Sequence, residues 1–506
     1  MKRVYMDYVR GKTIPRWDLF EVAIHCTKNF ANPFVDVPLE AEFLQGSHCM
    51  KVRGFFDGEG IWRIRFMPLE EGLWSFRTLS PVKELDGLEG DFLSTPPTSH
   101  GPVKVNHTHF TYADGTPFFV CGTTAYAWTY RPEYVRAETL RSFERYRFNK
   151  VRMLFFPKYL AWLKEVQLTY EPPSLPFEQK GGTMDFSRYG LDYFRNFETC
   201  IKDLNARGIE ADVILFHRYD FGRWGIDTGL DDDRACAFLD YLVARIGAFR
   251  NVWWSLANEY DLWITEDGVE AVSKPDQRDW DKLGEYLSSI DPYGHPISIH
   301  NWGPIYPDRP WLSHVSYQNA NVYSLLIELK HKYRKPVIND EYQYEGNLPY
   351  TWGNLSWEET TIRHWLTAMA GGYGTHGECY TFEGNNRDIF WTYGGTIRGG
   401  SASRIMFMRE IIESLPFQEM EPDHTLGDGR TKFCLRKGYE CYLFLFLPGS
   451  SNRRVRIGPL DSRRFNYQLT VWDAFECRKV KQIEVQTLYK ADADPGLVAV
   501  TAIRKG

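Results

Sequence analysis

Long hydrophobic runs are missing from this sequence of 506 residues. No window approaches the run of about 20 apolar residues that a membrane-spanning helix requires. The first eight residues, from Met1 to Tyr8, hold no apolar core of signal-peptide length. We therefore expect neither a membrane partner nor export, and we predict a cytoplasmic protein.

Paired cysteines are missing as well. The nine cysteines are scattered, odd in number and without CxxC spacing. A disulfide framework would need paired cysteines in an oxidising compartment, and a structural zinc site would need clustered ones. The pattern indicates reduced thiols, agrees with a cytoplasmic location and argues against a zinc site.

An excess of positive charge is missing too, since the formal net charge is −6. This balance argues against nucleic acid as the main partner. Aromatic residues, in contrast, make up 16% of the chain. Most of them fit the cores of β-sandwiches, and the remainder fit a ligand with flat apolar faces, as carbohydrates have.

Three segments follow one another along the chain. Residues 1–100 are β-rich: Trp62, Ile64 and Phe66 alternate with Arg63 and Arg65, which is the period of a half-buried strand. Residues 416–506 return to strands, with an apolar run over 442–447. We predict an N-terminal and a C-terminal β-sandwich domain on either side of a central domain of residues 101–415.

The central segment alternates short apolar runs with helical patterns. The runs are 118–124, 150–156, 210–217, 251–259, 296–301, 313–319, 335–341 and 372–378. One intervening helix is expected over 193–207, with Gly208 as its C-cap. Eight strands with helices between them predict an α/β fold, a (β/α)8 TIM barrel. An open doubly wound sheet would carry a Gly-rich phosphate turn after its first strand, and this sequence has none.

Polar side chains recur where these runs end. Glu259 ends the fourth run and Glu341 ends the seventh. In a barrel the C-terminal strand ends form the mouth that carries catalytic groups. Further polar residues at the same ends are Arg152, His217, Asn258, His300, Asn301, Tyr317 and His376. Packing can explain one polar residue at a strand end, but it does not explain a polar residue at the end of nearly every strand. We therefore predict a functional site at the mouth.

With these residues the barrel resembles glycoside hydrolase clan A, the retaining (β/α)8-barrel glycosidases. Members place an Asn-Glu pair at the end of the fourth strand, with the Glu as acid/base, and a nucleophilic Glu at the end of the seventh. Asn258, Glu259 and Glu341 match these positions. Three further clan positions, on the second, third and sixth strands, are matched by Arg152, His217 and Tyr317.

The layout, with a β-sandwich at each end, is also similar to a bacterial group near the apiosidase-like barrels. Tyr260 follows the Asn-Glu pair where many clan members have Pro, and His376 lies where the clan usually has Trp. Trp391, a short distance beyond, is expected to replace that sugar platform. Apiosidase-like relatives tend to carry Asp at the fourth strand, so specificity for apiose does not follow.

The resemblance implies a retaining glycoside hydrolase with a carbohydrate substrate and no cofactor. The expected cytoplasmic location favours small glycosides over polymers, because polymers cannot enter the cell. The two carboxyl groups of such a hydrolase would stand about 5–5.5 Å apart. Glu341 would attack the anomeric carbon, held ionised by Arg152 and hydrogen-bonded by Tyr317, while Glu259 would donate the proton. The other candidates for substrate binding are Asn258, His217, His300, Asn301, His376, Trp391, Trp224 and Glu345.

Two other functions stay open at this stage. A metal-dependent barrel hydrolase would use His217, His300 and His376, although the first strand lacks the usual His-x-His pair. A non-catalytic carbohydrate-binding protein would suit the two flanking domains, although it should lack one of the two carboxylates. The flanking domains could also mediate a homo-oligomer.

Overall fold

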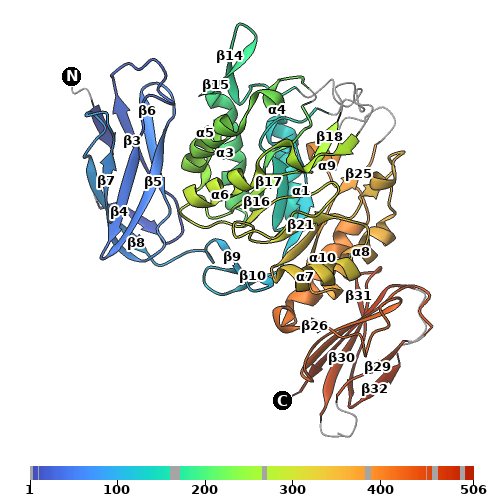
Figure 1. Cartoon of the computed structure of the whole chain (residues 1–506). Helices are drawn as coiled ribbons and strands as arrows, with labels where there is room; N and C mark the ends of the chain where they lie inside the picture. The colour runs from blue at the N-terminus through green and yellow to red at the C-terminus, as the bar shows by residue number, and fades with distance from the viewer. Residues whose placement is uncertain are drawn as a thin grey trace.

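Three β-rich units follow one another in the structure, and the central one holds the barrel (Figure 1). The computed structural model describes residues 4–8, 11–159, 171–220, 222–264, 271–381, 389–451, 453–458, 465–490 and 496–505. Within these ranges no helix is long and apolar enough to cross a bilayer.

Eight parallel strands form the barrel. In chain order they are β12 Cys121–Thr124, β13 Lys150–Leu154, β16 Glu210–Phe216, β17 Val252–Ala257, β20 Ile297–Ser298, β21 Val315–Gln318, β22 Val337–Glu341 and β24 Tyr373–His376. Their spatial order is β20-β17-β16-β13-β12-β24-β22-β21, so the first strand lies beside the eighth. The predicted TIM barrel is confirmed, and each of its eight predicted strands is present.

The ring closes between β20 and β21, the two ends of the hydrogen-bonded order. The backbone amide of Ser313, just before β21, donates to the carbonyl of Ile297 at 2.9 Å. The Ser313 hydroxyl also accepts from the Ile297 amide at 2.7 Å and donates to its carbonyl at 2.9 Å. One serine thus completes the ring where the strand ladder is short.

Helices connect the strands and cover the outside of the barrel (Figure 1). They are α1 Glu133–Arg145, α3 Leu191–Asn205, α5 Asp232–Ile246, α6 Trp280–Ile290, α7 Ser324–Tyr333, α8 Trp357–Met369 and α10 Ser401–Glu413. Two short helices, α4 Ile226–Gly229 and α9 Phe390–Tyr393, lie in loops beside the site instead. The predicted helix over 193–207 corresponds to α3, which buries Phe194, Phe197 and Ile201 in the core. The helix ends at Asn205 with Ala206 as its C-cap, so the predicted C-cap at Gly208 was wrong by two residues. Gly208 lies in the following turn at φ +66°, a conformation that favours glycine.

Charged side chains fill part of the barrel interior. Lys150 Nζ lies 2.5 Å from Asp212 Oδ2 and 3.3 Å from Asp340 Oδ1, and all three side chains are buried. Inward-facing residues of a strand are two apart, so Arg152 comes next along β13 after Lys150. Lys150, Asp212 and Asp340 thus form one layer of the barrel interior. The guanidinium of Arg152 lies in the next layer toward the C-terminal mouth.

The N-terminal domain is a sandwich of two sheets that share one long strand. Its strands are β1 Val4–Asp7, β2 Thr13–Pro15, β3 Phe20–Cys26, β4 Glu40–Gln45, β5 His48–Phe56, β6 Ile61–Phe66, β7 Gly72–Leu79 and β8 Glu89–Thr95. β5 pairs with β4 in one sheet and with β6 in the other. Arg65 departs from the predicted alternation: it is buried, and it pairs with Glu21 at 2.6 Å and with Glu198 of α3 at 2.8 Å. These pairs join the sandwich to the barrel.

The C-terminal domain is β-rich, as predicted, but its two layers are unequal. A six-stranded antiparallel sheet contains β26 Glu421–Pro422, β27 Lys432–Lys437, β28 Cys441–Phe446, β33 Val498–Arg504, β30 Tyr467–Asp473 and β31 Arg478–Val485. A ribbon of β29 Arg454–Arg456 and β32 Leu488–Lys490 forms the second layer. Phe433 and Leu443 belong to the core shared with the barrel, whereas Phe444 and Val455 pack in the core under the ribbon.

Candidate active site

The two predicted glutamates lie at the ends of their strands. Glu341 is the last residue of β22, and Glu259 lies two residues beyond the end of β17. Glu259 has a φ of +50°, a left-handed conformation that is uncommon for a residue with a side chain. Such strained positions persist where surrounding contacts determine them, and they are frequent at functional sites.

Glu341 is held as a carboxylate by two donors on one oxygen. Arg152 Nη1 donates to Oε1 at 2.9 Å, and the Tyr126 hydroxyl donates to the same atom. Burial alone would raise the pKa of Glu341, but nearby His300 and Arg152 and the hydrogen bond from Tyr126 bring it below the ordinary 4.5. Burial and Arg152 also lower the pKa of His300 to about 4, so Arg152 is the cation that stabilises Glu341 at neutral pH.

Glu259 is in the opposite electrostatic situation. Tyr219 donates a hydrogen bond to Oε2, and Gln318 Nε2 donates to Oε1 at 2.9 Å. Burial, followed by the negative charge of Glu341, raises the pKa of Glu259 to about 7, and these two donors offset part of that rise. The two carboxyl groups therefore favour different protonation states near neutral pH.

Asn258 connects the surroundings of the two glutamates. Its Oδ1 accepts from Arg152 Nη2 at 2.6 Å, and its Nδ2 donates to the Tyr219 hydroxyl at 2.7 Å. Because Arg152 binds Glu341 and Tyr219 binds Glu259, one hydrogen-bonded chain joins both carboxylates. Residues from four different strand ends thus meet at one mouth.

His217 and Asn301, predicted at the ends of the third and fifth strands, contact residues that bind Glu259 and not the glutamate itself. His217 Nδ1 accepts from the amide of Tyr219 at 3.0 Å and Nε2 contacts the Phe156 carbonyl at 3.1 Å, which fixes the Nε2–H tautomer. Burial lowers the pKa of His217 to about 3, so this ring is neutral. Asn301 accepts from the Gln318 amide at 3.3 Å, and its carbonyl accepts from Gln318 Nε2 at 2.9 Å.

Tyr317 does not take the place that the resemblance implies. Its hydroxyl is buried without a hydrogen-bond partner, and no described contact joins it to Glu341. The register between β21 and β22 shifts at this point: Tyr317 lies opposite Asn339, but the next residue, Gln318, lies opposite Glu341. This bulge directs Gln318 into the site. Tyr126, beyond the end of β12, supplies the phenol that bonds Glu341 instead.

Glu345 and His376 are fully buried and bonded to other parts of the chain, which corrects their prediction as sugar ligands. The Glu345 carboxylate accepts from the amides of Gly400 at 2.7 Å and Ser401 at 3.0 Å, at the start of α10. A Cβ added to Gly399 would lie 2.5 Å from this carboxyl group. His376 Nδ1 bonds the Thr123 hydroxyl at 2.9 Å. Glu345 therefore braces the start of α10, and His376 braces the neighbouring strand β12.

The histidines of the metal-dependent alternative do not converge. Over the described ranges, one group of side chains could share a cation: Glu345, His376 and Glu378. Its carboxylates are already bound by backbone amides of the α10 loop, with Glu378 accepting from Gly399 at 2.6 Å. Neither His217 nor His300 belongs to this group.

The two predicted tryptophans have different surroundings. Trp391 is buried, packs edge-on against Tyr126 at 5.5 Å between ring centroids and also contacts Tyr344. Trp224 is half-buried on the loop after β16, where its aromatic partner among the described residues is Tyr159 at 6.5 Å. Trp391 therefore lies beside the site, whereas no described contact joins Trp224 to either glutamate.

Lys158 is a site residue that the sequence patterns did not single out. Its ammonium lies 4.2 Å from the ring centroid of Tyr126, 4.4 Å from that of Tyr219 and 4.2 Å from that of Trp391. Burial lowers the pKa of Lys158 to about 7. Tyr126, Tyr219 and Lys158 all lie just beyond the ends of barrel strands. That position is the feature of the sequence from which they could have been predicted as site residues.

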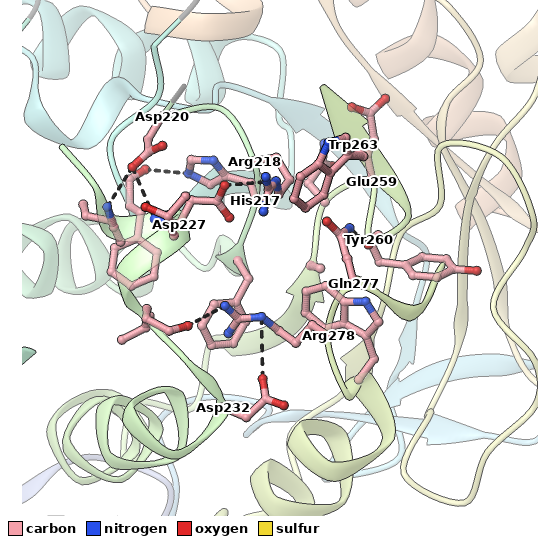
Figure 2. Close-up of a pocket in the computed structure, with 18 of the residues that line it drawn as sticks. His217, Arg218, Asp220, Asp227, Asp232, Glu259, Tyr260, Trp263, Gln277 and Arg278 are labelled. Atoms are coloured by element: carbon pink, nitrogen blue, oxygen red, sulfur yellow. Dashed lines mark hydrogen bonds and ion pairs between the residues drawn. The ribbon is translucent and has the colours of Figure 1, made fainter. Parts of the chain in front are cut away.

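A cavity of about 440 Å³ adjoins Glu259. The loops after β16 and β17 line it, with Trp263 and Tyr260 among its aromatic walls. Figure 2 shows two ion pairs in its lining: Arg218 with Asp227 at 3.0 Å, and Arg278 with Asp232 at 3.8 Å. Glu341 is not part of this lining, so the cavity opens on the Glu259 side of the site.

Comparison with known families agrees with this architecture. The profile of the family described as apiosidase-like, catalytic domain, matches residues 104–419. The chain belongs to the apiosidase-like family. A second profile, of a domain of unknown function (DUF5060), matches residues 13–81 of the N-terminal sandwich. No match was found among curated proteins.

Solved structures place this apiosidase-like chain among glycoside hydrolase barrels. It is 34% identical to a candidate glycoside hydrolase from Bacteroides vulgatus ATCC 8482, with a TM-score of 0.85 over 98% of this chain and 100% of the other. A glycoside hydrolase family 5 protein from the same organism shares the fold at a TM-score of 0.58 and 16% identity, over 80% of this chain and 93% of that one. The resemblance inferred from the strand-end residues is confirmed.

Proposed function

We propose that this apiosidase-like protein is a retaining glycoside hydrolase in which Glu341 is the nucleophile and Glu259 the acid/base. One observation carries the proposal: two carboxyl groups at one barrel mouth share a hydrogen-bonded chain but favour opposite protonation states. A retaining mechanism needs this asymmetry, because one group must attack as an anion while the other must donate a proton.

In the first step Glu341 attacks the anomeric carbon of the substrate. Tyr126 and Arg152 both bind Oε1, so we expect Oε2 to form the new bond. The bond to the leaving oxygen breaks with its electron pair, and the proton of Glu259 moves to that oxygen. The products are a glycosyl ester on Glu341 and a free leaving group.

In the second step the roles of the groups reverse. The Glu259 carboxylate takes a proton from a water molecule, whose oxygen attacks the anomeric carbon while the bond to Glu341 breaks. Glu259 regains its proton and Glu341 its charge, so the site returns to its starting state. Ester formation removes the negative charge of Glu341, which lowers the pKa of Glu259 and suits it to act as a base at this stage.

The surroundings suggest how the substrate lies. The acid/base stands on the leaving-group side of a glycosidic bond, and the 440 Å³ cavity adjoins Glu259. We infer that this cavity receives the leaving group, with room for a small glycoside rather than a long polymer. Asn258, between Arg152 and Tyr219, is suited to bind the 2-hydroxyl of the sugar.

Azide rescue tests the assignment of the two glutamates. A set of aryl glycosides in both anomeric series identifies a substrate first. Glu259→Ala should then lose hydrolysis of poor leaving groups, and sodium azide should restore turnover with release of a glycosyl azide of retained configuration. Normal activity in Glu341→Gln, together with no rescue of Glu259→Ala, would end the proposal.

A further inference from the structure

Lys158 carries a buried amino group that makes no ion pair with any described residue. Three lysines are buried in the described part of the chain. Lys150 pairs with Asp212 and Asp340, and Lys330 lies 3.4 Å from Glu421. Lys158 is 2% exposed, yet no hydrogen bond or ion pair is present at its ammonium among the described residues, where three aromatic rings surround it instead.

The position of this ammonium relates it to both catalytic carboxyl groups. The rings that it contacts include Tyr126, which donates to Glu341, and Tyr219, which donates to Glu259. Trp391 forms the third side. Lys158 therefore lies beside the two tyrosines that bind the catalytic carboxyl groups, where we expect the sugar that undergoes attack. It is not part of the lining of the leaving-group cavity.

An unpaired ammonium at this place has a chemical consequence. Removing an ammonium from water costs several kcal/mol unless a partner compensates it, and aromatic faces compensate only part of that cost. Positive charge also develops on the sugar in the transition state of glycoside cleavage. The carboxyl groups of Glu341 and Glu259 attract the ammonium of Lys158 through space, but neither is hydrogen-bonded to it. Its N–H groups are therefore free to bind an anionic group on the sugar, whose negative charge would offset the two positive charges.

We propose that Lys158 binds an anionic substituent of the substrate sugar, a carboxylate or a sulfate ester, and thereby selects acidic glycosides. This inference rests on the proposed glycosidase function. Among the described residues, the neighbouring cation Arg152 already contacts Glu341 and lies 3.8 Å from Asp340, whereas the ammonium of Lys158 remains available to a ligand. Its three N–H groups suit the oxygens of either anion.

Paired aryl glycosides test the selectivity. The wild-type protein should hydrolyse 4-nitrophenyl uronides or 6-sulfated glycosides with a kcat/KM about 30-fold or more above that of the matching neutral glycosides. Lys158→Met, which keeps the methylene chain and removes the charge, should erase this preference, and Lys158→Arg should keep most of it. Equal losses on acidic and neutral substrates in Lys158→Met would overturn the inference.

A binding measurement separates this inference from the proposed function. The full-length Glu341→Gln variant is titrated calorimetrically with D-glucuronate, D-galacturonate, glucose 6-sulfate and D-glucose, and its melting temperature verifies folding. Binding of an acidic sugar that disappears when Lys158→Met is added supports the role of Lys158, even where no glycoside is hydrolysed and the enzymatic proposal fails. Hydrolysis of neutral glycosides by a protein that binds none of the acidic sugars would remove the inference and leave the glycosidase.

Discussion

Tyr126 donates a hydrogen bond to Glu341 on the oxygen that also accepts from Arg152. Tyr126 lies just beyond β12, the first strand of the barrel, while Glu341 ends β22, the seventh. The contact therefore crosses the barrel mouth. Tyr126, after the first strand, makes the hydrogen bond to Glu341 that the clan resemblance assigns to Tyr317 on the sixth strand.

Removal of this phenol should slow the reaction. We expect Tyr126→Phe to lower kcat by about 10- to 100-fold, because a hydrogen bond to a charged group is lost. The pKa of Glu341 should rise, since the Tyr126 hydrogen bond lowers it, and the acidic limb of the pH profile should move to higher pH. Tyr317→Phe is the matched control, because the Tyr317 hydroxyl has no hydrogen-bond partner. Equal effects of the two variants would contradict the assignment.

The pH profile should reflect the two carboxyl groups separately. Activity requires a protonated Glu259 and an ionised Glu341. We expect kcat/KM to fall as the pH rises through the pKa of Glu259, about 7, and to fall at the acidic end below pH 4.5, since the pKa of Glu341 is lowered from that value. Initial rates with one aryl glycoside across this range measure both limbs. A profile that stays flat through pH 7 to 9 would argue against Glu259 as the acid.

Gln318 should tune the acid/base. Its Nε2 donates to Glu259 at 2.9 Å, which favours the carboxylate and lowers the pKa of that group. Gln318→Met should therefore move the alkaline limb to higher pH, by up to about one unit. Gln418→Met is a suitable control, since that amide binds the carbonyl of Phe110 instead. A downward shift in Gln318→Met, or an equal shift in the control, would show that the contact does not act on Glu259.

The junction between the N-terminal sandwich and the barrel should depend on pH. Burial raises the pKa of Glu198, but Arg65 and Arg245 lower it to about 2. Its charge thus stabilises the fold above the ordinary 4.5, and this contribution is lost as the pH falls toward 2. Glu198→Gln should cost about 3–5 kcal/mol in the free energy of unfolding at pH 7, because two buried arginines lose a partner.

Chemical denaturation at several pH values measures this cost. The difference between wild type and Glu198→Gln should shrink as the pH falls from 4.5 toward 2, because the carboxyl group is protonated in the unfolded chain below 4.5 but in the folded protein only near pH 2. Glu138→Gln, which alters the more exposed pair with Arg141, should change stability by less than about 1 kcal/mol at any pH. A constant difference for Glu198→Gln down to pH 2 would indicate lost packing instead of lost charge.

Several features could be predicted from the sequence because they are local. Apolar runs of strand length alternate with helical patterns, and this period is set by burial on a sheet or a helix face. The carboxylates Glu259 and Glu341 end two such runs, and parallel strands bring their C-terminal ends together, so their meeting followed from the barrel itself.

Other features depend on contacts between distant strands. The bulge between β21 and β22 exchanges Tyr317 for Gln318 at the site, and a register shift of one residue cannot be read from either strand alone. Glu345 was a candidate for substrate binding, but amides at the start of α10 bind its carboxylate instead.

The sequence by itself determined the barrel, the two flanking β-rich domains and the pair of glutamates, because hydrophobic period and strand polarity are properties of short segments. The tertiary structure alone decided which phenols bind those glutamates and that Lys158 lies among Tyr126, Tyr219 and Trp391. Side-chain direction beyond a strand end depends on loop conformation and on partners far away in the chain, and neither has a local periodic signal.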